Sequence, residues 1–246
     1  MGGAKDSLKP RPEKQTHARS SGKPFHDRCR SVPPNATQRA ASGAYIEPVQ
    51  IDHLVVAVPG LARAASEWAA RGFASVEGGV HPQWGTANRL IVLDTAYVEL
   101  VGVLDSGVAA ESRFGSWVAA GAARRESLIG VVMRDREFEE VCRRRNLKPI
   151  PGQRRRPDGG LVRWQLAGLE SMVDAGLPAF IDWAEIDPRL EDGVGKIESL
   201  DLGGGAATHE WLGGAVDAVH VVDGHAGPRQ AVVRRGEAVA VVTAVR

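Results

Sequence analysis

The sequence has few cysteines, no long apolar run and almost no net charge, and each of these absences excludes a class of protein. Only two of the 246 residues are cysteine, which excludes a disulfide framework, and two thiols cannot by themselves form a zinc site. No apolar run approaches the ~18 residues of a membrane-spanning helix, and the N-terminus lacks the apolar core of a signal peptide. A formal net charge of +1 gives no overall field that favours nucleic acid or membrane. We therefore expect a soluble, cytoplasmic protein under reducing conditions.

The basic charge is concentrated in an N-terminal tail, residues 1–47. Residues 1–44 hold nine Lys and Arg against three Asp and Glu, a net of +6, so the remainder carries about −5. The tail has almost no aliphatic residues and cannot bury enough apolar surface to offset its ordering entropy, so we predict that it is disordered. A basic arm can contact nucleic acid, but we expect a solvated tail with no nucleic-acid partner.

The remaining residues, 48–246, are predicted to form the folded domain, in which one order of elements repeats. The first unit, about residues 50–104, has the pattern strand, helix and three strands, and its opening strand is apolar on both faces. A second unit covers about residues 127–185, and a shorter one covers 195–245. The period of roughly 70 residues is a repeat of pattern and not of residue identity.

Two ionisable residues stand inside the apolar strands of the first unit. Glu99 lies between Val98 and Leu100, and an ionised carboxylate there is costly unless it is paired or coordinated. His53 lies in the opening strand. Taken singly, His53 could be a neutral core imidazole and Glu99 an edge-strand residue open to water. Together they indicate a metal or acid–base site in which Glu99 is catalytic, with Zn, Fe, Mn or Ni as the metal.

The repeat suggests a third ligand. Alignment of the last strands of the two units places Glu99 on Asp182, another carboxylate in an apolar strand. Alignment of the first strands places His53 on Ile129, which cannot ligate. The predicted metal ligands are therefore His53, Glu99 and Asp182, with water or substrate in the open positions. The alternative is that Asp182 pairs with an arginine.

A polar loop at residues 81–88 leads into a buried strand of the first unit. Histidine, threonine and asparagine there offer donors and acceptors, tryptophan offers a flat apolar wall, and Gly85 allows close backbone approach. The alternative is a structured turn in which Thr86 and Asn88 satisfy their own backbone. With residues of the neighbouring and second-unit strands, the predicted substrate-binding side chains are His81, Trp84, Thr86, Asn88, Arg89, Trp164 and Trp183.

Several of these segments resemble a known family. The segments IDHLVVAVPGL (51–61), GGVHPQWGTANRL (78–90) and AYVELVGV (96–103) resemble the vicinal-oxygen-chelate superfamily and, more closely, its glyoxalase-like domain branch. The segments PDGGLVRWQLAG (157–168) and LPAFIDW (177–183) are similar to that branch too. The resemblance implies an α+β fold in which repeated βαβββ units form curved mixed β-sheets around a cleft, with helices on the outside. It also implies metal ligands on the first and last strands of each unit, where His53 and Glu99 stand.

The resemblance leaves two functions open. One is a metal-dependent enzyme, a lyase, isomerase or dioxygenase, that acts on a small oxygenated metabolite whose adjacent oxygens chelate the ion. The other is a metal-free protein that binds and sequesters a small molecule, as antibiotic-resistance members do; the departure from the four-ligand pattern at Ile129 favours it. Paired units often complete such clefts across a dimer, so a homodimer is a further expectation.

Overall fold

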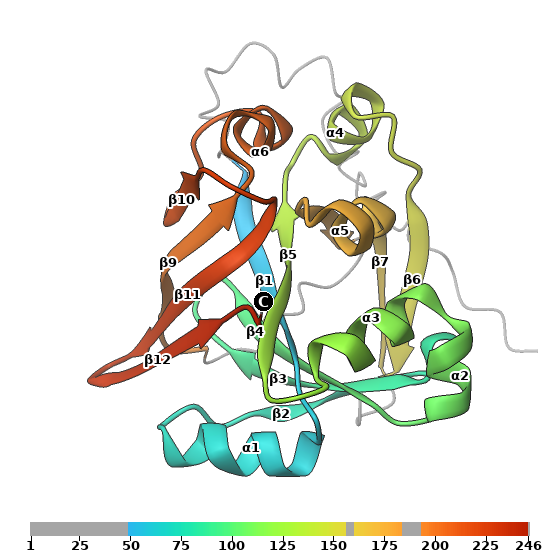
Figure 1. Ribbon diagram of the computed structural model, residues 1–246, viewed down its shortest axis with the longest axis vertical. Helices are drawn as coiled ribbons and strands as arrows, with labels where there is room; N and C mark the ends of the chain where they lie inside the picture. The colour runs from blue at the N-terminus through green and yellow to red at the C-terminus, as the bar shows by residue number, and fades with distance from the viewer. Residues whose placement is uncertain (1–48, 156–159, 184–192, 246) are drawn as a thin grey trace, which may run out of the picture. The chain divides into compact units, whose positions relative to one another are not determined.

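The structure, a computed structural model, describes residues 49–155, 160–183 and 193–245. The tail predicted to be disordered, residues 1–47, lies outside the described residues. Within the described ranges the chain forms an eight-stranded sheet, a four-stranded sheet and several helices (Figure 1). None of the helices described is long and apolar enough to cross a membrane.

The elements follow the predicted repeat. The first unit comprises β1 (Gln50–Ala57), α1 (Leu61–Ala70), β2 (Val76–His81), a 3₁₀ turn (Pro82–Trp84), β3 (Thr86–Val92) and β4 (Tyr97–Val103). Two connecting helices, α2 (Ser106–Glu111) and α3 (Arg113–Gly121), lead to the second unit, which comprises β5 (Ser127–Arg134), α4 (Phe138–Arg144), β6 (Ile150–Arg155), β7 (Leu161–Ala167), α5 (Leu169–Ala175) and β8 (Ala179–Trp183). The C-terminal elements are β9 (Lys196–Gly203), α6 (Gly205–Leu212), β10 (Val219–Val222), β11 (Gly227–Arg235) and β12 (Ala238–Thr243).

The strand order of the eight-stranded sheet confirms the predicted α+β fold of repeated βαβββ units. The order is β2-β3-β4-β1-β5-β8-β7-β6, so each unit contributes one half and the opening strands β1 and β5 meet at the centre. β1 and β5 pair in antiparallel, whereas each opening strand pairs in parallel with the last strand of its own unit, β4 or β8. The two halves therefore repeat one arrangement around the β1–β5 pair, and both curl toward the side where α3 and α5 lie (Figure 1).

The opening strand is buried on both faces, as its apolar sequence predicts. Leu54 and Val56 belong to one hydrophobic core, which also contains side chains of α1, α4 and the four-stranded sheet. Val55 and Ala57 belong to a second core, which α3 and α5 cover. Alternate residues of a strand point to opposite faces, so one strand supplies both cores.

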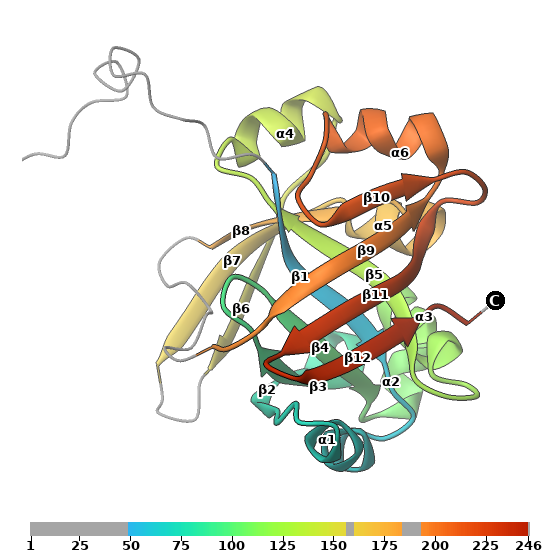
Figure 2. The same ribbon diagram turned by 90° about the vertical axis from the view of Figure 1, so that its left-hand side faces the viewer.

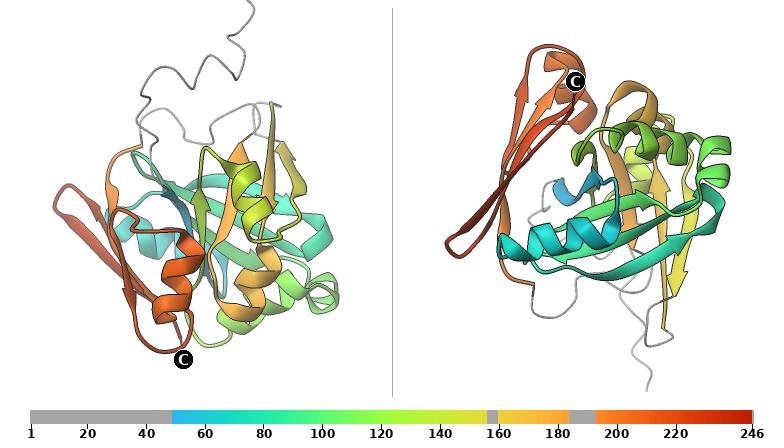
Figure 3. Two further views of the ribbon diagram at one scale, coloured as in Figure 1. Left: turned by 90° about the horizontal axis from the view of Figure 1, so that it is seen from above. Right: turned by 60° about the horizontal axis from the view of Figure 1, so that its bottom comes forward.

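The four-stranded sheet, in the order β10-β9-β11-β12, packs on the first of these faces (Figures 2 and 3). Leu200 and Ala231 from this sheet are fully buried in the same core as Leu54. The shorter third pass in the sequence thus forms a covering layer and not a third part of the main sheet. The opposite face of the main sheet is left to α3 and α5, where the second core lies.

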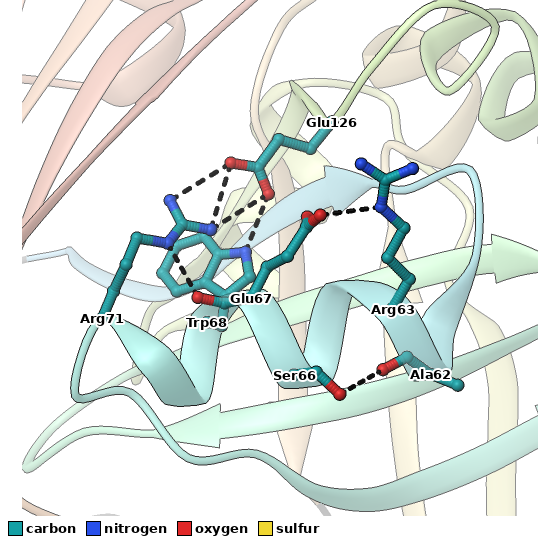
Figure 4. A network of polar contacts seen from close by, with 7 residues as sticks. All are labelled: Ala62, Arg63, Ser66, Glu67, Trp68, Arg71 and Glu126. Atoms are coloured by element: carbon teal, nitrogen blue, oxygen red, sulfur yellow. Dashed lines mark hydrogen bonds and ion pairs between the residues drawn. The ribbon is translucent and has the colours of Figure 1, made fainter.

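A polar network fixes α1 against the chain that leads into β5 (Figure 4). The indole Nε1–H of Trp68 donates to Glu126 Oε2 at 2.8 Å, and the Arg71 guanidinium donates to Glu126 Oε1 at 3.3 Å. The same guanidinium lies 4.3 Å from the centroid of the Trp68 ring. Trp68 is fully buried, and its burial stabilises the fold by about 2–3 kcal/mol. The contact therefore joins a helix of the first unit to the second.

Two local features of the second unit do not follow from its sequence pattern. The basic segment Ile150–Arg155 forms β6 and pairs in antiparallel with β7. β6 is the edge strand of the sheet, where proline and charged residues are tolerated because one side of the strand needs no ladder partner. Helix α5, between β7 and β8, was not predicted from the sequence.

Candidate functional site

A small cavity lies on the face of the eight-stranded sheet that α3 and α5 cover. Its volume is about 70 Å³, and its polar lining consists of His53, His81, Asn88, Tyr97 and Glu99. The remaining lining is aliphatic and aromatic and comes from β1, β3, β5, β7, α3, α5 and the 3₁₀ turn. A polar cluster enclosed by apolar walls is the usual composition of a site for a small molecule.

The sheet register brings His53 and Glu99 together. β1 and β4 are parallel neighbours in which His53 pairs with Tyr97, and Val55 pairs with Glu99. Because residues two apart in a strand share a face, His53 and Glu99 lie diagonally on the cavity face. His53 Nε2 lies 3.6 Å from Glu99 Oε2, and both residues are less than 10% exposed. The ring of Tyr97 stacks on the imidazole with 4.5 Å between ring centroids.

Asp52, which the sequence patterns did not single out, orients His53. The β1–β5 register shifts between Ile51 and His53, so Asp52 is the extra residue of a β-bulge. Its Oδ1 lies 2.7 Å from His53 Nδ1, and it is 2% exposed. Strand alternation alone would place the two side chains on opposite faces; the bulge allows them to meet. The only signal in the sequence was a second ionisable residue inside a buried strand.

The Asp52 carboxylate has further partners that hold it in place. The indole Nε1–H of Trp183 donates to its Oδ2 at 3.1 Å, and Arg134 Nη1 lies 3.6 Å from the same oxygen. A carboxylate only accepts hydrogen bonds, so the proton between Asp52 and His53 lies on His53 Nδ1. In the neutral imidazole, Nε2 then carries a lone pair that faces Glu99.

A positive charge between His53 Nε2 and Glu99 Oε2 would be favourable. Both atoms are acceptors when the imidazole is neutral, and a buried lone pair against a buried carboxylate is unfavourable. The 3.6 Å separation is longer than an N–H···O hydrogen bond of about 2.7–3.2 Å. Either a proton on Nε2 or a metal ion between the two atoms satisfies the pair.

Asn88 fixes the other oxygen of Glu99. Its Nδ2–H donates to Glu99 Oε1 at 2.5 Å, and its Oδ1 accepts from the backbone N–H of Gly79 at 2.6 Å. Gly78 makes room for this arrangement, because a Cβ at position 78 would collide with Asn88 Oδ1. The Glu99 carboxylate is therefore held by Asn88 through one oxygen and presents the other to His53.

The segment 81–88, predicted as a loop, consists of the end of β2, a 3₁₀ turn and the start of β3. His81 and Thr86 are paired residues of β2 and β3, and His81 Nδ1 lies 3.1 Å from Thr86 Oγ1. Both are buried. Gly85 adopts φ +64°, a left-handed conformation that glycine tolerates well, and so allows the reversal. Of these residues His81 lines the cavity directly, and Thr86 supports it.

Aromatic side chains enclose the cavity. The ring of Trp84 packs against the rings of His81 and of Phe114 in α3, with 5.6 Å and 4.7 Å between ring centroids. Trp164 of β7 lines the cavity and lies 5.4 Å from Trp183 of β8, its partner across the sheet. Trp183 contributes indirectly, through its hydrogen bond to Asp52.

The structure does not bring Asp182 or Arg89 to this cavity. Ile181 belongs to the core beside the cavity and Trp183 packs against it, so alternation along β8 places Asp182 on the opposite face. Asp182 is exposed and lines a separate surface depression on α4. Arg89, next to Asn88 in β3, points away as well and donates to the Oγ and carbonyl oxygen of Ser75 at 3.0 and 3.2 Å.

The pair His53 and Glu99 fits two adjacent positions of a divalent metal ion. Ligand bonds of about 2.0–2.2 Å place neighbouring ligand atoms about 3.3–3.5 Å apart in tetrahedral geometry, close to the observed 3.6 Å. A carboxylate that holds the second nitrogen of a ligating histidine, as Asp52 does, is the usual outer partner of such a site. In the part of the chain that the structure describes, no group of three His, Cys, Asp or Glu could hold an ion. Among the described residues, the pair therefore offers two candidate ligand groups.

Among the residues that the structure describes, the second unit shows no polar counterpart of this pair. On the same face of the sheet it presents Val132 of β5 and Ala179 and Ile181 of β8. The polar groups of the cavity thus come from the first unit, whereas the second unit contributes an apolar wall.

Comparisons with known proteins agree with this fold. A family model described as "Glyoxalase-like domain" matches residues 51–214. A solved structure of a hypothetical protein from Staphylococcus aureus superposes with a TM-score of 0.64 at 16% identity and covers 80% of this chain and 100% of its own. That likeness shows the fold alone.

Two further solved structures have lower scores. A methylmalonyl-CoA epimerase from Mycobacterium tuberculosis gives a TM-score of 0.39 at 17% identity, over 55% of this chain and 88% of its own. A mutant 4-hydroxymandelate synthase from Streptomyces coelicolor gives 0.42 at 13% identity, over 80% of this chain and 63% of its own. No curated protein matches the sequence.

Proposed function

Since the chain belongs to the glyoxalase-like domain family of the vicinal-oxygen-chelate superfamily, we propose that it is an enzyme acting on a small oxygenated metabolite. In this proposal His53 and Glu99 hold a divalent metal ion in the cavity. The single observation that carries it is the separation of 3.6 Å between His53 Nε2 and Glu99 Oε2, with the other atoms of both groups already engaged by Asp52 and Asn88.

Each residue of the cavity has a role in this proposal. Asp52 keeps the proton on His53 Nδ1 and so leaves Nε2 free to donate its lone pair. Asn88 holds Glu99 Oε1 and leaves Oε2 as ligand or as acceptor of a substrate proton. A bound divalent ion would polarise a carbonyl or hydroxyl oxygen of the substrate as a Lewis acid. Trp84 and Trp164 exclude water from the reacting atoms.

The size of the cavity limits the substrate. About 70 Å³ is well below the roughly 300–1,000 Å³ of a drug-sized site. The part of the substrate that reaches His53 and Glu99 is therefore small. It contains a few non-hydrogen atoms, and its oxygen atoms face the polar side chains of the cavity. The two-ligand set also predicts an ion held more weakly than at a catalytic zinc site with three protein ligands.

Metal titration tests the proposal. The protein is stripped with a chelator and titrated in turn with Zn²⁺, Mn²⁺, Fe²⁺ and Ni²⁺ while bound metal is measured by calorimetry and elemental analysis. We expect one ion per chain in the wild type, and none in His53→Ala and Glu99→Gln. His220 and Asp201 form a matched control pair, since they make a histidine–carboxylate contact of 3.3 Å on an exposed surface; His220→Ala and Asp201→Asn should retain the ion. Equal metal content in all five proteins would refute the proposal.

The second candidate function is metal-free binding of a small apolar or aromatic compound. The two-ligand limit and the aromatic enclosure by Trp84, Phe114 and Trp164 favour it. Tryptophan fluorescence with a compound panel in the presence of a chelator distinguishes the two. Binding that persists without metal, with no turnover of the bound compound, supports sequestration; turnover that returns only with added metal supports the enzyme.

A further inference from the structure

We propose that a second cavity, separate from the one at His53, binds an amphipathic anion, a molecule with an apolar body and one anionic head group. This cavity has a volume of about 520 Å³ and lies between α3, α5 and the chain that leads into β11. Its size falls within the roughly 300–1,000 Å³ of small-molecule sites. It is much larger than the 70 Å³ of the cavity at His53.

The walls of the large cavity are fixed by contacts between segments that are distant in the sequence. Gly176, which ends α5, packs so closely on the backbone of Ala226 and Gly227 that a side chain at position 176 would collide with it. The last strand is tied in as well. The backbone N–H of Val245 donates to Ser127 Oγ at 2.8 Å, and that of Ala244 donates to the carbonyl oxygen of Arg229 at 2.9 Å. The cavity is therefore built into the fold.

The lining is apolar with an excess of positive charge. Trp117, Ile129, Met172 and other aliphatic side chains form most of the surface, and the lining includes two arginines, Arg124 and Arg229. Of the described residues that line it, none is Asp or Glu. An apolar body would therefore meet matching walls, while its head group would meet two cations.

Neither arginine is neutralised by a carboxylate in the part of the chain that the structure describes. Arg229 Nη2 donates to the carbonyl oxygen of His225 at 2.7 Å, which leaves its charge uncompensated. Arg124 makes no hydrogen bond or ion pair with another described residue and is exposed at the rim. Other surface arginines of the chain pair with acids, for example Arg234 with Glu198 at 2.8 Å. The two cations at this cavity are thus available to an anion.

Met172 and Trp117 separate the two cavities. Met172 lines both, and Trp117 lies beside it over Gly130, where a Cβ would collide with both side chains. The lining of the large cavity thus includes neither His53 nor Glu99. Substitutions at His53 should leave it intact, which keeps the two proposals separable.

Calorimetry with octanoate and with 1-octanol, its uncharged counterpart, tests the inference; octyl phosphate distinguishes a carboxylate from a phosphate head group. We expect octanoate, octyl phosphate or both to bind the wild type at one site, about ten-fold tighter than 1-octanol. Arg124→Gln and Arg229→Gln should each weaken the anion about ten-fold and leave 1-octanol unchanged. Arg125→Gln, at an exposed neighbour that does not line the cavity, is the matched control and should bind as the wild type does.

A second pair of variants locates the site without altering charge. Ala119 and Ala120 are both exposed on α3, but only Ala120 lines the cavity. Ala120→Trp should abolish binding by filling the space, and Ala119→Trp should not; circular dichroism checks that both fold. Binding should also persist in His53→Ala. The inference is overturned if no anion binds at millimolar concentration, if 1-octanol binds equally well, or if Ala120→Trp or both arginine variants bind like the wild type.

Discussion

His53 Nδ1 and Asp52 Oδ1 lie 2.7 Å apart although the two residues are consecutive in one β-strand. The β-bulge at Asp52 makes this contact compatible with pairing on both sides of β1. The first unit thus holds a histidine whose tautomer and ring orientation are set before any ligand arrives. This pre-orientation is the basis of the first prediction.

Asp52→Asn should weaken metal binding at the proposed site. The amide does not hold the His53 Nδ1 proton as strongly as a carboxylate, and loss of such an outer partner costs about 10–100-fold in metal affinity. Calorimetric titration with the metal that the wild type binds most tightly measures the change. Asp94→Asn, at an exposed aspartate, is the control and should not alter affinity. Unchanged affinity in Asp52→Asn would show that the contact does not serve a metal ligand.

Gly78→Ala should disturb the Glu99 carboxylate from a distance. The added Cβ would displace Asn88 Oδ1, which breaks the contact of Asn88 with Gly79 and shifts its hydrogen bond to Glu99. We expect the free energy of unfolding to fall by about 1–3 kcal/mol, measured by urea denaturation. Gly60→Ala is the control, because a Cβ there meets nothing within 4 Å and the backbone is extended. Similar unfolding midpoints for the two variants would contradict this account of position 78.

Glu126→Gln should destabilise the fold more than Glu67→Gln. Glu126 accepts from the buried Trp68 indole and from Arg71, whereas Glu67 pairs with Arg63 on an exposed helix surface. Hydrogen bonds to a charged acceptor contribute about 1.5–3 kcal/mol, and exposed helix pairs about 0.3–0.5 kcal/mol. Chemical denaturation measures both variants. The expectation fails if the two substitutions lower the unfolding free energy equally.

Cys142 should be unreactive in the folded protein. Burial raises the pKa of its thiol above the ordinary value, the nearby Glu139 adds to the rise, and Arg145 opposes it. In a Cys29→Ser background we expect a thiol reagent to modify Cys142 slowly at pH 8 and rapidly after denaturation. Rapid modification of the native protein would contradict this.

The same shift predicts a pH dependence of stability. Because the pKa is raised in the folded state, the unfolded state loses the thiol proton first as the pH rises. The contribution of the protonated Cys142 thiol to the free energy of unfolding is complete below the unfolded-state pKa of about 8.5 and declines as the pH rises above it. Unfolding curves from pH 7 to 10, in the Cys29→Ser background, should show a decline that is smaller in Cys142→Ala. Parallel declines would assign the effect to other groups.

The sequence predicts much of the fold because burial and alternation are local properties. The doubly buried β1 and the repeated order of elements follow from apolar patterning, and the meeting of His53 with Glu99 follows from placing the first and last strands of a unit side by side. Asp52 could not be assigned, because the bulge that turns it depends on the register against β5.

The residues that the structure places away from the cavity are positioned by distant strands. Asp182 follows the alternation of β8, in which Ile181 and Trp183 take the cavity side. Arg89 follows the alternation of β3, in which the side chain of Asn88 faces the cavity and that of Arg89 points to the opposite face. The arginine-rich β6 forms a strand because β7 offers a free edge, which composition alone does not reveal.

The cavity has a polar side formed by β1, β2, β3 and β4 and an apolar side to which β5, β7, α3 and α5 contribute, which gives it a direction. A site with two equivalent halves could receive a molecule with two different ends in either of two poses. Here only one pose sets oxygen atoms against His53 and Glu99 and carbon atoms against Val132 and Trp164. A ligand with one polar and one apolar end therefore has one favoured orientation, and a ligand that is polar at both ends should bind more weakly.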